Sequence, residues 1–417
     1  MSATVRSGGR HHYRGADDTA KPRSGHGHGH GPAPPASRRV RMLLVTVLVP
    51  LALATLVGLW LTWPGAMPRS SADIGFGQRP VQGEVLAATS APCTSGSTGV
   101  GQAKKCVSFD VQLTNGDSPG VTIQQLLPDE PGTPRFTVGD HVVLAYTGGN
   151  PAEPGSYQLQ DFQRGSSMLW LAALFAAAVL LLGRWRGLAS LIALGFSFLV
   201  LVAYLFPAIL TGENPVVVGV LAASVIMFGV LYLTHGVSAQ TSSAVLGTVL
   251  SLALIGVLGT AFSAVTQLTG LDDDTDNLIR VLGHGIDARG LLLAGIIVGA
   301  LGVLDDVTVT QTSAVWELRR ANPTLGARAL YTAALRIGRD HVSSAVNTLT
   351  LAYAGAALPV LLTFSLSGQS FGTLITAQNV AQEVVRTLVG SIGLVAAVPI
   401  TTAIAAVVAR RDEIDTA

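Results

Sequence analysis

Long apolar runs separated by short polar segments dominate the chain. One run covers residues 42–63, and seven more lie near 167–183, 187–206, 215–233, 242–266, 290–318, 343–363 and 387–409. A run of about 20 apolar residues is long enough for a helix to cross the hydrocarbon core of a bilayer. The pattern therefore predicts an all-α polytopic membrane protein with about eight transmembrane helices. We expect these helices to contact the lipid bilayer as their partner.

Composition agrees with this class. Hydrophobic residues make up 49% of the 417 residues, charged residues only 12%, and mean hydropathy is +0.50. An ordinary soluble domain carries about 25% charged residues. The net charge of +1 also excludes a globally basic nucleic-acid binder, so no nucleic-acid partner is expected.

The arginines predict the orientation of the spans. Arg38, Arg39 and Arg41 precede the first run, which we interpret as a retained signal anchor with a cytoplasmic N-terminus. Threading the chain from there leaves nine arginines in short inner segments: Arg184, Arg186, Arg319, Arg320, Arg328, Arg336, Arg339, Arg410 and Arg411. The short outer segments carry three: Arg280, Arg289 and Arg386. The bias predicts a multi-pass protein of the cell membrane with both termini cytoplasmic.

The polar ends have no apolar period. Residues 1–41 are rich in His, Gly and Pro and are expected to be a disordered cytoplasmic tail, with residues 410–417 a second short tail. The N-terminal tail holds five of the nine histidines. Loose metal binding and a plain flexible tail are both open interpretations, and the second is preferred.

The segment 64–166 between the first two spans follows a different pattern. Short β-type runs such as 106–113 alternate in period two and are separated by turn clusters such as 115–120. We expect a small extracytoplasmic β-barrel-like domain of the OB type after the first helix. Cys93 and Cys106 lie in this oxidising part, and a disulfide between them would contribute about 3 kcal/mol through loop closure.

The span at 290–318 carries the strongest candidate chemistry. Asp305 and Asp306 lie about 22 Å along a helix that starts near Gly290, inside the hydrocarbon slab. An intramembrane aspartate costs about 2.5–3.5 kcal/mol to insert and is a functional candidate by default. Helical spacing places Asp306, Thr310, Ser313 and Glu317 on one face. Oxygen groups alone suit protons or hard cations. The competing interpretation ends the span at Leu304 and makes an aspartate the N-cap of a separate interfacial helix.

The following segments add further candidates. Asn347 lies about one turn inside the next span, either as an interhelical hydrogen-bond donor or as a partner of the aspartates. Arg336 and Arg339 precede it and could supply cytoplasmic counter-charge. Glu383 and Arg386 are expected to form a local i, i+3 pair near the outer surface. No nucleophile, zinc or nucleotide motif occurs, so an enzyme is not expected and no cofactor is predicted; the sequence does not define a metal site.

From about residue 80 onward the chain resembles the YibE/YibF family of bacterial integral membrane proteins. The resemblance rests on the β-type domain and on 157–164, 212–215, 299–318, 337–340, 347–353 and 390–401. It implies a polytopic membrane protein without an assigned activity. A weaker similarity joins 304–310, 319–339, 347–350 and 390–402 to the membrane halves of proton-driven exporters of the Sec accessory type. That similarity implies proton coupling.

Two functions remain in competition. In the first, the protein is a secondary transporter or permease for an ion or small solute, with Asp305 and Asp306 as a charge relay. Thr310, Ser313, Glu317 and Asn347 would line its path. In the second, the helices are a platform whose β domain binds an envelope protein, peptide or glycan. A homo-oligomer is compatible with either function.

Overall fold

The computed structural model describes residues 37–65, 78–93, 105–272, 275–276, 279, 286–366, 368 and 370–411. The predictions for residues 1–36 and 412–417, and for Arg280, lie outside these residues.

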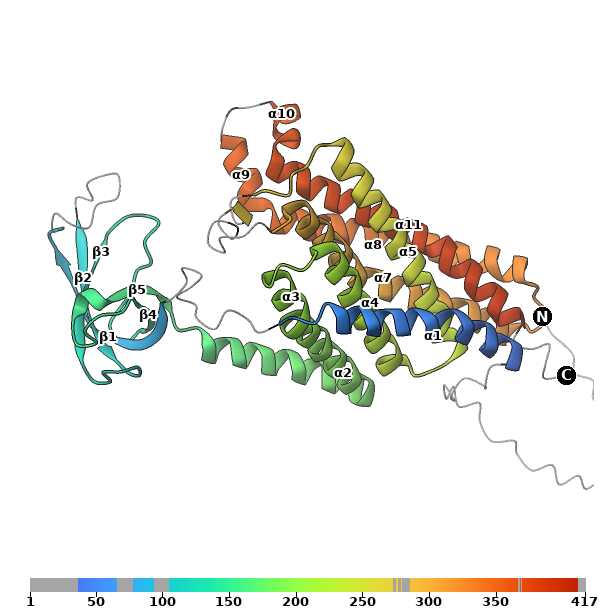
Figure 1. The fold of residues 1–417 in the computed structure, drawn as a ribbon, viewed down its shortest axis with the longest axis horizontal. Helices are drawn as coiled ribbons and strands as arrows, with labels where there is room; N and C mark the ends of the chain where they lie inside the picture. The colour runs from blue at the N-terminus through green and yellow to red at the C-terminus, as the bar shows by residue number, and fades with distance from the viewer. Residues whose placement is uncertain are drawn as a thin grey trace, which may run out of the picture. The chain divides into compact units, whose positions relative to one another are not determined.

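Five strands form one antiparallel sheet with the order β3-β2-β1-β4-β5. They are β1 Arg79–Ala91, β2 Cys106–Leu113, β3 Thr122–Pro128, β4 His141–Tyr146 and β5 Tyr157–Phe162, with a short 3-10 turn at Pro154–Ser156. The sheet curls into a half-barrel (Figure 1). Register shifts in β1 and in β4–β5 increase its local twist.

Alternation explains why one face of the sheet is buried. Val85, Phe109, Leu113 and Leu144 are at most 3% exposed and point to one side, because successive strand residues face opposite ways. Cys93, just after β1, is bonded to Cys106 at the start of β2, with 5.2 Å between their Cα atoms. The disulfide closes the end of the β1–β2 pair.

The remaining described chain is helical. The helices are α1 Arg38–Leu61, α2 Gly165–Val200, a π-helical turn at Leu201–Leu205, α3 Phe206–Leu210, α4 Pro215–His235, α5 Ala239–Val265, α7 Ala288–Ala321, α8 Ala327–Ala356, α9 Leu358–Leu366, α10 Phe371–Thr376 and α11 Gln378–Arg411. Within the described ranges, six helices are long and apolar enough to cross a membrane. They are α1, the continuous segment Gly165–Leu210, α4, α5, α7 and α11.

The 46-residue segment Gly165–Leu210 is not one straight helix. Arg184 leaves helical geometry at φ 50° and ψ −125°. A Cβ on Gly187 would lie only 2.3 Å from the carbonyl oxygen of Val179. Residues eight apart in a straight helix are about 12 Å apart along the axis, so the chain reverses sharply here. Of the two runs predicted in this region, 167–183 precedes the reversal and 187–206 follows it.

The run expected at 343–363 is divided between α8 and α9, which meet at Ala357. Charged residues in the first half of α8, among them Arg336, Arg339 and Asp340, keep α8 out of the six apolar helices. The structure therefore supports a helical membrane protein without fixing the number of crossings at eight.

Helices α5, α7 and α11 pack closely together, with α8 beside α7 and α11 (Figure 1). Thr248 meets Thr308 while Gly259 meets Leu293, so α5 and α7 are antiparallel. The contacts of Gln311 with Thr402 and of Gly295 with Arg386 make α7 and α11 parallel. This arrangement brings the polar residues of three separate segments to one level.

Candidate functional site

A run of buried polar side chains occupies the contact between α5, α7 and α11, and we call it the polar seam. Its members are Thr248, Ser251, Thr308, Gln311, Thr401 and Thr402. Each is at most 1% exposed. A buried polar group must find a hydrogen bond or lose free energy, so the bonds within the seam determine how the three helices pack.

Two side-chain hydrogen bonds join the helices across the seam. The hydroxyls of Thr248 and Thr308 are 2.9 Å apart, linking α5 to α7. Thr402 Oγ1 lies 2.8 Å from Gln311 Oε1 and donates to it, linking α11 to α7. Hydrogen bonds of this kind stabilise helix pairs in membranes by about 0.6–2 kcal/mol each.

Glycines allow the backbones to approach the seam. A Cβ on Gly247 of α5 would lie 2.2 Å from Thr401 Oγ1 of α11. A Cβ on Gly338 of α8 would lie 2.6 Å from Gln311 Nε2. The backbone of α8 therefore covers Gln311, and the seam is closed on that side.

Asp305 lies one turn before Thr308 on the same helix, 17 residues after Ala288 and 16 before Ala321. The antiparallel register places it level with Ser251, near the middle of α5. The side chain is partly buried, and its Oδ1 is buried without a hydrogen-bond partner among the described residues. An unpartnered carboxylate oxygen at this depth is costly, so Asp305 is the strongest functional candidate in the helices.

Asp306 lies in a different environment from Asp305. Its side chain is 76% exposed, and its Oδ2 is 3.9 Å from Nε2 of His341 on α8. Helix α7 runs without a break from Ala288 to Ala321, so the N-cap interpretation of the two aspartates is wrong. Because α7 is continuous, successive aspartates point about 100° apart, and only Asp305 has an oxygen buried in the bundle.

Asp306, Thr310, Ser313 and Glu317 lie on one face of α7, as predicted, but much of this face is exposed. Glu317 is exposed and accepts from Arg320 at 2.6 Å. Ser313 is partly buried and accepts from Gln240 Nε2 of α5 at 2.9 Å, and the Thr310 hydroxyl donates to the Asp306 carbonyl. The structure thus places the three residues near the outside of the bundle and not in the seam.

The candidates on α8 are also exposed. Arg336, Arg339 and Asn347 all have exposed side chains. Over the described part of the chain, Asn347 forms no hydrogen bond to Asp305 or Asp306. The structure does not bring these three residues together with the buried carboxylate.

Sequence reasoning overlooked the seam. Thr308 and Gln311 are on the same helix as the aspartates, but they lie on a different face from Asp306, Thr310, Ser313 and Glu317, which form the predicted site. The available signal was a second polar stripe on α7, at 308, 311 and 312, paired with polar Thr401-Thr402 in the last span. The sequence alone gives no means of deciding which stripe is buried.

A cavity of about 650 Å³ lies between α8, α9 and α11. Glu383 and Arg386 line it and form the predicted i, i+3 pair at 2.6 Å, which is confirmed. The Tyr353 hydroxyl also lines it and lies 3.0 Å from the position of a Cβ on Gly299. Gly299 is six residues before Asp305, about 9 Å along α7. The cavity therefore approaches the level of the buried carboxylate.

No group of three His, Cys, Asp or Glu side chains that could hold a metal ion occurs among the residues that the structure describes.

Several long apolar helices around a polar interior, joined to a separate β sheet, define an α-helical membrane protein. The profile of the YibE/F-like proteins matches residues 171–411, more than half of the chain, and the protein belongs to this family. The match runs from α2 to α11 and leaves out α1 and the sheet. No curated protein and no solved structure matches the chain, and the similarity to exporters finds no support in these comparisons.

Proposed function

We propose that the protein is a secondary transporter for a proton, a cation or a small solute, with Asp305 as the carboxylate that binds the transported charge. One observation carries the proposal: a carboxylate oxygen lies buried in the middle of α7, with no hydrogen-bond partner in the part of the chain that the structure describes. Intramembrane carboxylates commonly mark ion or proton pathways.

The polar seam supplies the neighbouring oxygen groups. Thr308 Oγ1 lies one turn away from Asp305, and Ser251 lies level with it on α5. Hydroxyl and carboxylate oxygens suit hard cations and protons. In this proposal the cavity beside Tyr353 and Arg386 would form the outer part of a route from one end of the bundle.

The exposed candidates take secondary roles in this proposal. Asp306 with His341 would carry charge between Asp305 and the basic end of α8, where Arg336 and Arg339 supply counter-charge. Thr310, Ser313, Glu317 and Asn347 would line the outer side of that route. Proton coupling is part of the same proposal.

The neighbouring aspartates provide the test. Asp305→Asn and Asp306→Asn are each reconstituted into proteoliposomes, and proton flux is followed with an entrapped pH dye under an imposed gradient, alone and with Mg²⁺, Ca²⁺ or Mn²⁺. We expect Asp305→Asn to abolish flux and Asp306→Asn to lower it by much less, because Asp306 is exposed to solvent and takes only a secondary role in the proposal. Equal flux in wild-type protein and Asp305→Asn would refute the proposal.

A second candidate function rests on the β domain. A hollow of about 370 Å³ lies over β2, β3 and the following loop, lined among others by Phe109, Leu127, Arg135 and Phe136. The sheet order resembles that of an OB-type barrel, which uses the face of its second and third strands for binding. An envelope protein, peptide or glycan would bind there.

Deleting residues 79–162 separates the two functions. Both variants are expressed in a strain whose own gene for this protein is deleted. If the protein is a transporter with a dispensable outer domain, the variant without residues 79–162 should restore the phenotype lost in that strain, and Asp305→Asn should not. A platform protein predicts the reverse, with the aspartates affecting only stability.

A further inference from the structure

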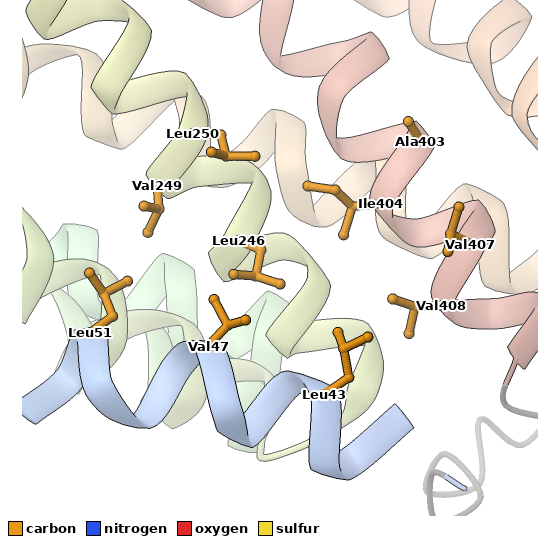
Figure 2. Close-up of a pocket in the computed structure, with 10 residues that line it drawn as sticks. All are labelled: Leu43, Val47, Leu51, Leu246, Val249, Leu250, Ala403, Ile404, Val407 and Val408. Carbon is orange, nitrogen blue, oxygen red and sulfur yellow. The ribbon is translucent and has the colours of Figure 1, made fainter. Parts of the chain in front are cut away.

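An open, wholly aliphatic groove lies between α1, α5 and α11. Figure 2 shows its lining, which comes from all three helices: Leu43, Val47, Leu51, Leu246, Val249, Leu250, Ala403, Ile404, Val407 and Val408. Its volume is about 770 Å³, within the range of about 300–1,000 Å³ that small-molecule sites occupy. Leu43, Val47 and Val407 are 44%, 48% and 45% exposed, so the groove is accessible from the side of the bundle.

The groove exists because α1 packs with only one of its stripes. Val40, Leu44 and Leu48 are buried against the bundle, while the adjacent stripe at 43, 47 and 51 faces the groove. At its other end α1 is fixed by the Thr62 hydroxyl, 2.6 Å from the Tyr204 hydroxyl, and by stacking of Trp63 on Tyr204. Helix α1 and α11 thus leave a cleft between them on the side where α1 begins.

Arginines surround that side of the groove. Arg38, Arg39 and Arg41 lie within two turns of Leu43, and Arg410 and Arg411 lie within one turn of Val408, the last lining residue of α11. The Ser37 hydroxyl donates to the Arg411 carbonyl at 3.5 Å, which brings both groups of arginines to the same end of the bundle. All five side chains are exposed.

These guanidinium groups have no carboxylate partner within the described ranges. Beyond those ranges the sequence continues with Asp412, Glu413 and Asp415, so the five arginines outnumber the adjacent acidic residues by two. Guanidinium forms two-point hydrogen bonds to phosphate oxygens.

We propose that this groove is a binding site for an anionic phospholipid, whose acyl chain lies along α1, α5 and α11 and whose phosphate contacts the arginines. An aliphatic lining accepts a hydrocarbon chain, and a basic cluster at a membrane surface attracts anionic headgroups. A second copy in the same orientation is a poorer occupant, because it would bring two arginine clusters together. The lipid would hold α1, which lies outside the family match, against the family's helices.

The test compares two lipids with identical acyl chains. Delipidated full-length protein in detergent receives phosphatidylglycerol or phosphatidylcholine, and bound lipid is counted by native mass spectrometry while the melting temperature is recorded. We expect tighter binding and a larger rise in melting temperature with phosphatidylglycerol. Added salt should diminish this difference, because exposed charges are screened.

Two variants locate the site. Replacing Arg38, Arg39, Arg41, Arg410 and Arg411 by Gln should weaken phosphatidylglycerol binding at least about tenfold, since it removes the positive charges that attract the anionic headgroup. Val47→Phe with Val407→Phe fills the groove and should reduce binding of both lipids. Arg186→Gln with Arg328→Gln removes exposed arginines elsewhere and should leave binding unchanged.

If wild-type protein bound the two lipids equally in low salt, the proposed contact between the phosphate and the arginines would be refuted. This result needs no variant. Undiminished binding by the filled groove would overturn the location. A cross-link between two copies at Val47→Cys, formed in native membranes, would assign the groove to a second copy instead.

Discussion

The crossing of α5 and α11 at Gly247 gives the sharpest stability prediction. In Gly247→Ala the new Cβ would lie 2.2 Å from Thr401 Oγ1 and 2.9 Å from Thr401 Cβ, closer than side-chain atoms normally approach. Thr401 is fully buried, and a β-branched side chain has few rotamers with which to move aside. The helices must therefore separate, and overpacking of this kind costs about 1–3 kcal/mol.

Gly256, on the same helix, is the matched control. A Cβ there would meet only Ile297 Cδ1 at 4.0 Å. Both substitutions gain the same helix propensity, so the difference between the two variants isolates the overpacking. We expect Gly247→Ala to unfold with a free energy about 1–3 kcal/mol below that of Gly256→Ala.

The assay is equilibrium unfolding in mixed micelles with increasing SDS, followed by circular dichroism and tryptophan fluorescence. Thr401→Ala should partly rescue Gly247→Ala, because it removes Oγ1 and Cγ2 of Thr401 and leaves only its Cβ in close contact. Among the described residues Thr401 Oγ1 has no hydrogen bond to lose. Equal unfolding free energies for Gly247→Ala and Gly256→Ala would show that the helices are not in close contact here.

Two further predictions concern the β domain. Replacing both Cys93 and Cys106 by Ser should lower the unfolding free energy of the β domain by about 3 kcal/mol. Thermal melting followed by the β-sheet circular dichroism signal measures this, and wild-type protein with and without reductant gives a second comparison. No change would mean that the cross-link does not restrain the unfolded chain. The second concerns Asp161, whose pKa is held below its usual range by the Arg164 guanidinium at 2.5 Å and by the backbone N–H of Phe162. The stabilising effect of the ionised Asp161 should be complete above the ordinary aspartate pKa and should disappear as pH falls through the lowered pKa. Asp161→Asn should therefore reduce the loss of unfolding free energy that acid causes. An unchanged acid dependence of stability, or an ordinary pKa for Asp161 by NMR titration, would contradict this.

The sequence by itself determined the class of the protein and its main division. Apolar runs of membrane-spanning length and scarce charge indicate a membrane protein, because hydrocarbon excludes polar side chains whatever the fold. Period-two alternation predicted β2, because only one face of its sheet is buried and the other face is polar. The disulfide predicted between Cys93 and Cys106 is confirmed. The helical spacing of Asp305 and Asp306 also followed from the sequence.

Tertiary structure decided which of these residues matter to one another. In a lipid-facing helix both the buried and the exposed faces are apolar, so hydrophobic periodicity does not reveal the face that packs inward. On α7 that face is set by contacts from distant segments: Thr248 on α5, Thr402 on α11 and the backbone at Gly338 on α8. These contacts bury Thr308 and Gln311. On the same helix one oxygen of Asp305 is buried while Asp306 is exposed, a difference between adjacent identical residues that no local pattern contains. The same long-range packing sets α1 apart from α11 and creates the aliphatic groove.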